Sequence, residues 1–109
     1  MDLNAKHCVP CEEGTEPLSD GKEEELLNEI PQWLLLRDGT HKIRRQFKFK
    51  NFKEAMIFVN KVAETAESEG HHPSISIFYN VVQLDLFTHA SGGLSENDFI
   101  LASKINRLT

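Results

Sequence analysis

The segment from Asn51 to Gly70 constrains the fold more than any other part of the chain. Its apolar residues recur three or four positions apart, which is the period of one face of an α-helix. They are Phe52, Ala55, Met56, Val59, Val62, Ala63 and Ala66. Asn51 is a favourable N-cap with Glu54 at its third position, and Gly70 is the usual residue for a left-handed C-terminal cap. We therefore expect one long amphipathic helix that ends just before two adjacent histidines.

Strand-like segments lie on both sides of this helix. Before it, Trp33–Arg37 and His41–Lys50 are typical of two strands, and the Asp38-Gly39 pair between them is a hairpin signal. After it, residues 75–89 alternate in two short runs, and we place the tight turn between them at Asn80-Val81. Two hairpins are therefore expected, one on each side of the long helix.

Two further helices are predicted from capping patterns. Asp20 with Glu23 predicts the start of a short helix before Pro31, and Ser95 with Asp98 predicts the start of a final helix. A two-layer sandwich is the simplest way to bury the apolar faces of these elements. The sequence thus predicts an α+β fold, with three helices packed on one face of a four-stranded antiparallel sheet in the order α-β-β-α-β-β-α.

Composition sets the class of protein. With 109 residues and 39% hydrophobic residues, one domain fits and two do not. Residues 1–17 lack periodicity and predict an irregular N-terminal arm, so we assign a single domain to 18–109. The net charge of −5 argues against nucleic-acid binding through bulk charge. No apolar run of about 18 residues and no signal-like N-terminus is present, so we expect a soluble cytoplasmic protein with no membrane partner.

Three other features leave alternatives open. Cys8-x-x-Cys11 has the spacing of half a zinc ribbon or a redox motif, yet two reduced surface thiols explain it equally simply. The basic run over 42–50 fits a solvated strand face or a phosphate-binding surface. Ile57 and Phe58 lie outside the main helical stripe, which suggests either a subunit contact or partial burial within the monomer.

Histidines are the strongest chemical candidates. With the turn at residues 80 and 81, antiparallel pairing sets His89 opposite His72, next to His71. Glu67 precedes His71 by one helical turn, and Asp98 begins the last helix near the same rim. Such a cluster suits proton transfer near neutral pH, although a polar loop without chemistry is the simpler interpretation. Zinc binding is the third possibility, but adjacent histidines lack the i, i+4 spacing that aims two rings at one ion.

The same residues form a longer pattern with fixed spacing. The pattern is Glu67-x3-His71-His72-Pro73-x5-Tyr79-x9-His89-x8-Asp98. In residue type and spacing it resembles the signature of pterin-4a-carbinolamine dehydratases. The resemblance implies a lyase that removes water from 4a-hydroxytetrahydropterin to give quinonoid dihydropterin, and thereby recycles the cofactor of aromatic amino-acid hydroxylases.

The resemblance also implies roles and partners. His71 and His89 are expected to transfer protons, whereas His72, Glu67 and Asp98 are expected to bind or position the substrate. No metal and no other cofactor is expected. A homodimer or homotetramer with a functional link to a hydroxylase is implied. The alternative is a protein-binding module that acts as a dimerisation cofactor of a transcription factor.

Overall fold

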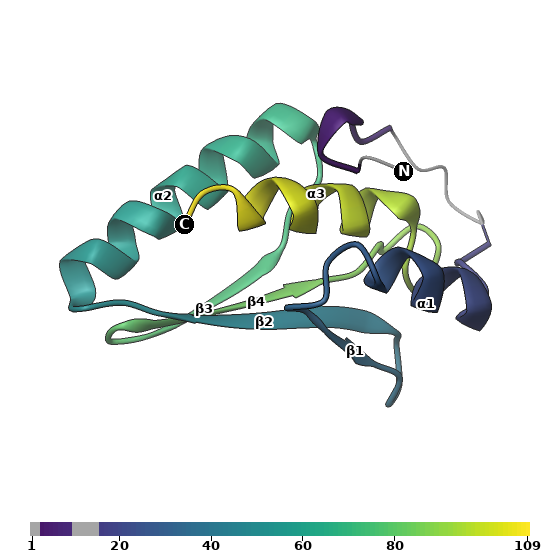
Figure 1. The fold of residues 1–109 in the computed structure, drawn as a ribbon, viewed down its shortest axis with the longest axis horizontal. Helices are drawn as coiled ribbons and strands as arrows, with labels where there is room; N and C mark the ends of the chain where they lie inside the picture. The colour runs from purple at the N-terminus through teal and green to yellow at the C-terminus, as the bar shows by residue number, and fades with distance from the viewer. Residues whose placement is uncertain (1–2, 10–15) are drawn as a thin grey trace.

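Residues 3–9 and 16–109 are described in the computed structural model of the protein (Figure 1). The elements are η1 (Leu3–Ala5), α1 (Asp20–Leu27), β1 (Leu34–Leu36), β2 (Lys42–Lys48), α2 (Phe52–Glu69), β3 (Ser74–Phe78), β4 (Val81–Leu86) and α3 (Glu96–Asn106). The strands form one antiparallel sheet in the order β1-β2-β4-β3. Figure 1 shows all three α-helices on the same side of this sheet. The predicted α+β architecture and element order are confirmed.

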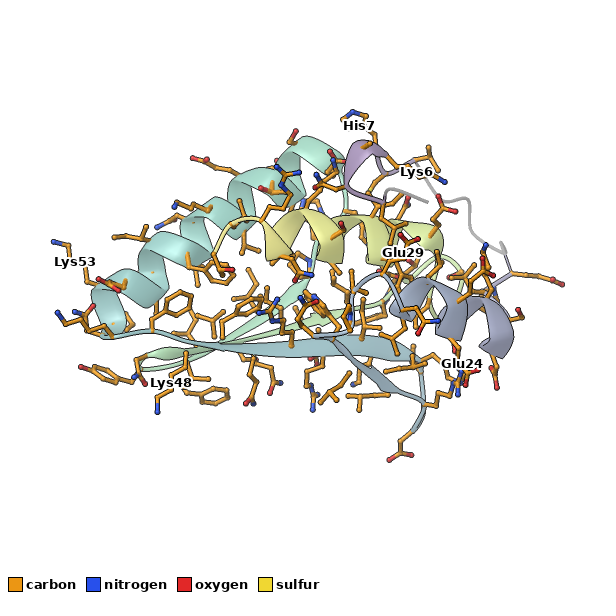
Figure 2. All side chains as sticks on the ribbon, viewed as in Figure 1. Lys6, His7, Glu24, Glu29, Lys48 and Lys53 are labelled. Atoms are coloured by element: carbon orange, nitrogen blue, oxygen red, sulfur yellow. The ribbon has the colours of Figure 1, made fainter. Side chains whose placement is uncertain are left out.

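The core lies between the sheet and the helices. Alternate residues of β4 point to this layer, and Val82, Leu84 and Leu86 are fully buried. Apolar side chains fill the space between the two layers in Figure 2, whereas the labelled Lys48 and Lys53 point away from it. The opposite face of the sheet carries most of the polar residues of β2 and β4, which explains why only one face is covered by helices.

Helix α2 begins and ends as predicted. The Asn51 side chain accepts a hydrogen bond from the Glu54 N–H at 2.9 Å, and Gly70 adopts a left-handed conformation with φ of 66°. The face that packs on the sheet includes Phe58, which is 3% exposed and lies 4.6 Å from Phe47 between ring centroids. The interpretation of Phe58 as a subunit contact is therefore wrong, because its ring fills the core of the monomer.

The second hairpin turns one residue earlier than predicted. Phe78 pairs with Val81, so the turn consists of Tyr79 and Asn80 rather than Asn80 and Val81. Tyr79 has a positive φ of 54°, which is uncommon for a bulky side chain. Partner numbers therefore add up to two less than predicted, and this register would set residue 72 opposite Phe87 instead of His89. The predicted direct pairing of His72 with His89 is wrong.

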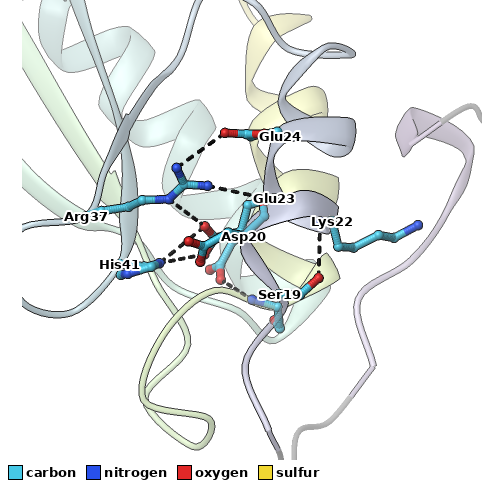
Figure 3. Close-up of polar contacts among 9 residues, drawn as sticks. Ser19, Asp20, Lys22, Glu23, Glu24, Arg37 and His41 are labelled. Atoms are coloured by element: carbon cyan, nitrogen blue, oxygen red, sulfur yellow. Dashed lines mark hydrogen bonds and ion pairs between the residues drawn. The ribbon is translucent and has the colours of Figure 1, made fainter.

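Helix α1 is capped by a different residue from the one predicted. The Ser19 side chain accepts from the Lys22 N–H at 3.2 Å, so Ser19 and not Asp20 is the N-cap. Glu23 does not serve a capping box but is fully buried, where it accepts hydrogen bonds from Arg37 Nε at 3.1 Å and His41 Nδ1 at 2.9 Å (Figure 3). These contacts join α1 to the loop between β1 and β2.

Residues 3–9 lie beside α3 and the C-terminal end of α2 (Figure 1). Leu3 is buried in the core. Val9 and Asn97 exchange two hydrogen bonds: the Val9 N–H donates to Asn97 Oδ1 at 2.9 Å, and Asn97 Nδ2 donates to the Val9 carbonyl at 2.6 Å. This part of the predicted arm is therefore attached to the first turn of α3.

Candidate functional site

His71 is the most enclosed of the three motif histidines. Because α2 stops at Gly70, His71 is the first residue of the following loop, and its N–H still donates to the Ala66 carbonyl at 3.2 Å. Its side chain is 13% exposed, and its Nε2 lies 2.6 Å from Oδ1 of Asp98, which is fully buried. The end of α2 and the start of α3 thus bring together residues that are far apart in the sequence.

Asp98 is held on both carboxylate oxygens. Its Oδ2 accepts from the Ser95 N–H at 2.9 Å, as in a capping box, and from the Thr88 hydroxyl at 2.8 Å. Thr88 Oγ1 is also 2.6 Å from Ser95 Oγ. The capping pattern of Ser95 with Asp98 is confirmed, whereas the contact of Thr88 with Asp98 was not predicted from the sequence. The position of Thr88 directly before a motif histidine places it near the site but does not indicate its partner.

His72 forms a separate pair with the other motif carboxylate. Its Nε2 lies 2.6 Å from Glu67 Oε1, while the two side chains are 61% and 79% exposed. Glu67 therefore contacts His72 and not His71, although it precedes His71 by one helical turn. Burial distinguishes the two pairs: Asp98 is out of contact with solvent, and Glu67 is surrounded by it.

His89 lies on a turn after β4. An isolated bridge between Thr88 and Gly93 closes this turn, and the Thr88 N–H donates to the Gly93 carbonyl at 2.7 Å. The His89 ring is exposed and lies 5.8 Å from the Phe87 ring between centroids. Within residues 3–9 and 16–109, no hydrogen bond joins His89 to His71 or His72. His89 shares its loop with Thr88, which links it to Asp98.

The contacts of Asp98 determine which nitrogen of His71 carries hydrogen. An ionised carboxylate only accepts hydrogen bonds, so Asp98 Oδ1 requires a hydrogen on His71 Nε2. In the neutral ring, Nδ1 then has the lone pair and is the basic nitrogen. Such an imidazole can take a proton at Nδ1 and return it, while the carboxylate stabilises the cation formed in between.

Cys8 is the described half of the Cys-x-x-Cys motif, and Cys11 lies outside the described residues. Cys8 Sγ lies 3.5 Å from the Asn97 carbonyl oxygen. Burial, followed by the nearby charge of Glu69 and a hydrogen bond to it, raises the pKa of the Cys8 thiol to about 12. A thiol with so high a pKa is a poor nucleophile and a poor metal ligand at neutral pH.

Glu69 fastens the segment around Cys8 to the end of α2. Burial alone would raise the pKa of Glu69, but hydrogen bonds from the Cys8 N–H and the His7 ring and the charge of Lys104 lower it overall. The carboxylate is 7% exposed and stays charged at neutral pH. It therefore anchors the arm one residue before Gly70 and two residues before His71.

Two other candidate surfaces involve none of the motif histidines. Among the described residues, Asp20, Glu23 and His41 form the group whose ligand atoms are close enough to hold a metal ion. Arg37 already donates to Glu23 there, so a cation would compete with a guanidinium (Figure 3). On the basic strand, Arg44 donates two hydrogen bonds to Asp85, at 2.7 Å and 2.9 Å, and is thus neutralised within the sheet.

Comparisons with known proteins identify the family. The profile of the family described as Pterin 4 alpha carbinolamine dehydratase matches residues 16–108. This chain belongs to the pterin-4a-carbinolamine dehydratase family. Two curated relatives are each named "Putative pterin-4-alpha-carbinolamine dehydratase". One, from Chlorobium luteolum, is 44% identical over 98% of this chain and 95% of its own length; the other, from Methylococcus capsulatus, is 45% identical over 97% and 92%.

A solved structure supports the same assignment. The crystal structure from Brucella melitensis, described as a transcriptional coactivator/pterin dehydratase, has a TM-score of 0.79 and 33% identity to this chain. The structural match covers 85% of this chain and 98% of the Brucella melitensis chain. The motif predicted membership of the dehydratase family. These matches confirm that prediction, and they extend over nearly the whole chain. No helix in the described parts of the chain is long and apolar enough to cross a membrane.

Proposed function

We propose that this chain is a lyase that converts 4a-hydroxytetrahydropterin to quinonoid dihydropterin and water. The hydroxyl group at C4a leaves as water after it is protonated, and a ring nitrogen of the pterin loses its proton as the C=N bond forms. One proton is consumed and one is released, so imidazoles suffice as acid and base. The observation that carries the proposal is the His71–Asp98 pair, in which a buried carboxylate fixes a partly exposed imidazole.

The family motif is divided between proton transfer and positioning. His71, held at Nε2 by Asp98, uses Nδ1 to transfer one proton, and His89 transfers the other from the turn after β4. His72, paired with Glu67, holds the pterin in place. Because Asp98 is fully buried and bonded on both oxygens, it acts through His71 and does not touch the substrate. The reaction requires no metal and no other cofactor.

Rapid mixing with freshly generated carbinolamine tests this proposal. The wild-type protein should accelerate dehydration above the spontaneous rate, and His71→Ala and His89→Ala should each lower kcat on the order of 10²-fold or more. His7→Ala is the control, because His7 is 81% exposed on the arm and lies outside the motif. Equal rates for the wild type and His71→Ala would sink the proposal.

Zinc content distinguishes this mechanism from metal-assisted hydrolysis. Elemental analysis of active protein should show no stoichiometric zinc, and treatment with a chelator should leave the dehydration rate unchanged. A rate that falls with the chelator and returns with zinc would favour the metal mechanism.

The physiological setting follows from the chemistry of the substrate. The carbinolamine is formed by pterin-dependent aromatic amino-acid hydroxylases, so we propose that this chain returns their cofactor to the reduction cycle. We also propose that it acts in the cytoplasm. We further propose a homodimer or homotetramer, since the apolar residue Ile57 on α2 is 49% exposed. Light scattering of the purified protein measures this state, and a monomer at all concentrations would contradict it.

A second candidate function is suggested by the Brucella melitensis structure, whose description includes transcriptional coactivator. In that case, the chain would form a specific complex with a transcription factor. Loss of His71 and His89 would not weaken such a complex, whereas it would abolish dehydration. Co-purification of the wild type and the double alanine variant therefore separates the two functions.

A further inference from the structure

Thr88 occupies a position that links the two halves of the site. It is 4% exposed, directly precedes His89, and contacts the carboxylate that holds His71. Its backbone is fixed on both sides, because its N–H donates to the Gly93 carbonyl at 2.7 Å and its carbonyl accepts from the Gly92 N–H at 3.1 Å. The side chain thus projects from a closed turn.

The hydrogen bonds around Thr88 have only one consistent direction. A threonine hydroxyl has a single hydrogen to donate. That hydrogen is directed at Asp98 Oδ2, 2.8 Å away, so the 2.6 Å contact between Thr88 and Ser95 requires Ser95 to donate and Thr88 to accept. The chain of donors therefore runs from Ser95 through Thr88 to Asp98.

This direction fixes the orientation of the Asp98 carboxylate. Oδ2 accepts two hydrogen bonds, from the Thr88 hydroxyl and the Ser95 N–H, which leaves Oδ1 for His71 Nε2. In a buried site no water replaces a lost donor, so removal of the Thr88 hydroxyl leaves Oδ2 with one partner. The carboxylate can then rotate, and the preference for hydrogen on Nε2 of His71 weakens.

We propose that Thr88 is a positioning residue of the dehydratase site: its hydroxyl orients Asp98, which in turn keeps the hydrogen of His71 on Nε2. The expected change in kcat rests on the proposed function, whereas the expected position of the hydrogen on the His71 ring does not. Thr88→Val removes the hydroxyl at nearly constant volume, Thr88→Ser keeps it, and Thr40→Val is a control at an exposed threonine.

The decisive experiment is ¹⁵N NMR of the His71 ring, since the shifts of its two nitrogens report which one carries hydrogen. The wild type, Thr88→Ser and Thr40→Val should show the Nε2–H form, whereas Thr88→Val should show a mixture with Nδ1–H. An unchanged His71 ring in Thr88→Val would overturn the inference. The same mixture in Thr88→Ser would overturn it too, because the effect would then not follow the hydroxyl.

Kinetics and a measurement on the wild type complete the test. Thr88→Val should lower kcat about 10-fold with KM nearly unchanged, because a hydrogen bond to a charged group is lost at a distance from the substrate.

If Thr88→Val does not fold, hydrogen exchange of the Thr88 hydroxyl in the wild-type protein tests the inference instead. Slow exchange supports the hydrogen bond to Asp98, and exchange as fast as at the Thr40 hydroxyl overturns it. Absence of dehydratase activity in a wild type with the predicted ring signals would reject the proposed function alone.

Discussion

His71 and His72 are neighbours in the sequence, and each pairs with a carboxylate at the same distance, yet the two pairs differ in kind. Both contacts are 2.6 Å from Nε2 to a carboxylate oxygen. The His71–Asp98 side chains are 13% and 0% exposed, whereas those of His72 and Glu67 are 61% and 79% exposed. The distance between two groups therefore does not determine how much their contact contributes to stability or catalysis.

Burial changes both the electrostatics and the freedom of the pair. Water and salt screen the exposed pair, and two mobile side chains lose entropy when they meet. Asp98 instead has three donors, which are the His71 ring, the Ser95 N–H and the Thr88 hydroxyl. We therefore expect His71 to be preorganised, while His72 and Glu67 adjust to whatever binds beside them.

The first prediction concerns the dehydration rate and carries the largest effect. Asp98→Asn should lower kcat on the order of 10²-fold, because the amide no longer stabilises the His71 cation or selects its tautomer. Glu67→Gln should change the rate by less than about 5-fold, since an exposed pair contributes at most about 1 kcal/mol. Rapid mixing with the carbinolamine measures both. Equal losses in the two variants would remove the distinction between the pairs.

The second prediction concerns stability. Asp98→Ala leaves the buried Thr88 hydroxyl and the partly buried Ser95 N–H without their carboxylate, and we expect the free energy of unfolding to fall by about 3 kcal/mol. Glu67→Ala should remain within about 1 kcal/mol of the wild type, because it removes only a solvated ion pair. Urea denaturation followed by circular dichroism measures the difference. A loss of similar size in Glu67→Ala would show that the exposed pair also supports the fold.

The same contrast explains which parts of the site were predictable from the sequence. The long helix, its caps at Asn51 and Gly70, and the loop position of His71 follow from local rules, since each depends on neighbours within about one turn. The pairing of His71 with Asp98 depends on how α2 and α3 pack, so the sequence predicts only the approximate position of the carboxylate. Nothing local indicates that Thr88 contacts Asp98.

The errors have the same origin. Rules for turns favour glycine or asparagine at positive φ, but Tyr79 takes that conformation, and the register of the second hairpin shifted by two. A shift of two keeps every side chain on its predicted face, so the sheet was correct while the His72–His89 partnership was not. Glu23 was assigned to a cap because its partners, Arg37 and His41, lie outside the local pattern.

The third prediction compares the pairs by double-mutant cycles on stability. The coupling of His72 with Glu67 should be about 0.2–1 kcal/mol at low salt and should decline in 1 M NaCl, where the Debye length is about 3 Å. The coupling of His71 with Asp98 should be larger and should change little, because salt has no access to the carboxylate. In these cycles each histidine is replaced by glutamine, Asp98 by asparagine and Glu67 by glutamine. All four substituted side chains therefore stay polar. Equal salt dependence of the two couplings would contradict the role assigned to burial.

The fourth prediction uses Cys8 as a reporter of the two carboxylates, and its effect is the smallest. The charge of Asp98 contributes to the raised pKa of the Cys8 thiol after burial and Glu69, whereas Glu67 does not contribute. Loss of a negative charge favours the thiolate, so Asp98→Asn should lower the pKa of Cys8 and speed its alkylation a few-fold.

Iodoacetamide labelling at pH 8 and 9 in a Cys11→Ser background measures this effect, because the rate follows the thiolate fraction. A pKa of about 12 instead of 9.0 makes that fraction about 10³-fold smaller at these pH values, so labelling of the folded protein should be slow in every variant. Glu69→Gln should accelerate it most and Asp98→Asn less. Glu67→Gln should match the parent protein, since its carboxylate lies in solvent. Equal acceleration in Asp98→Asn and Glu67→Gln would mean that labelling follows a general loosening of the fold, and that Cys8 does not detect the buried charge.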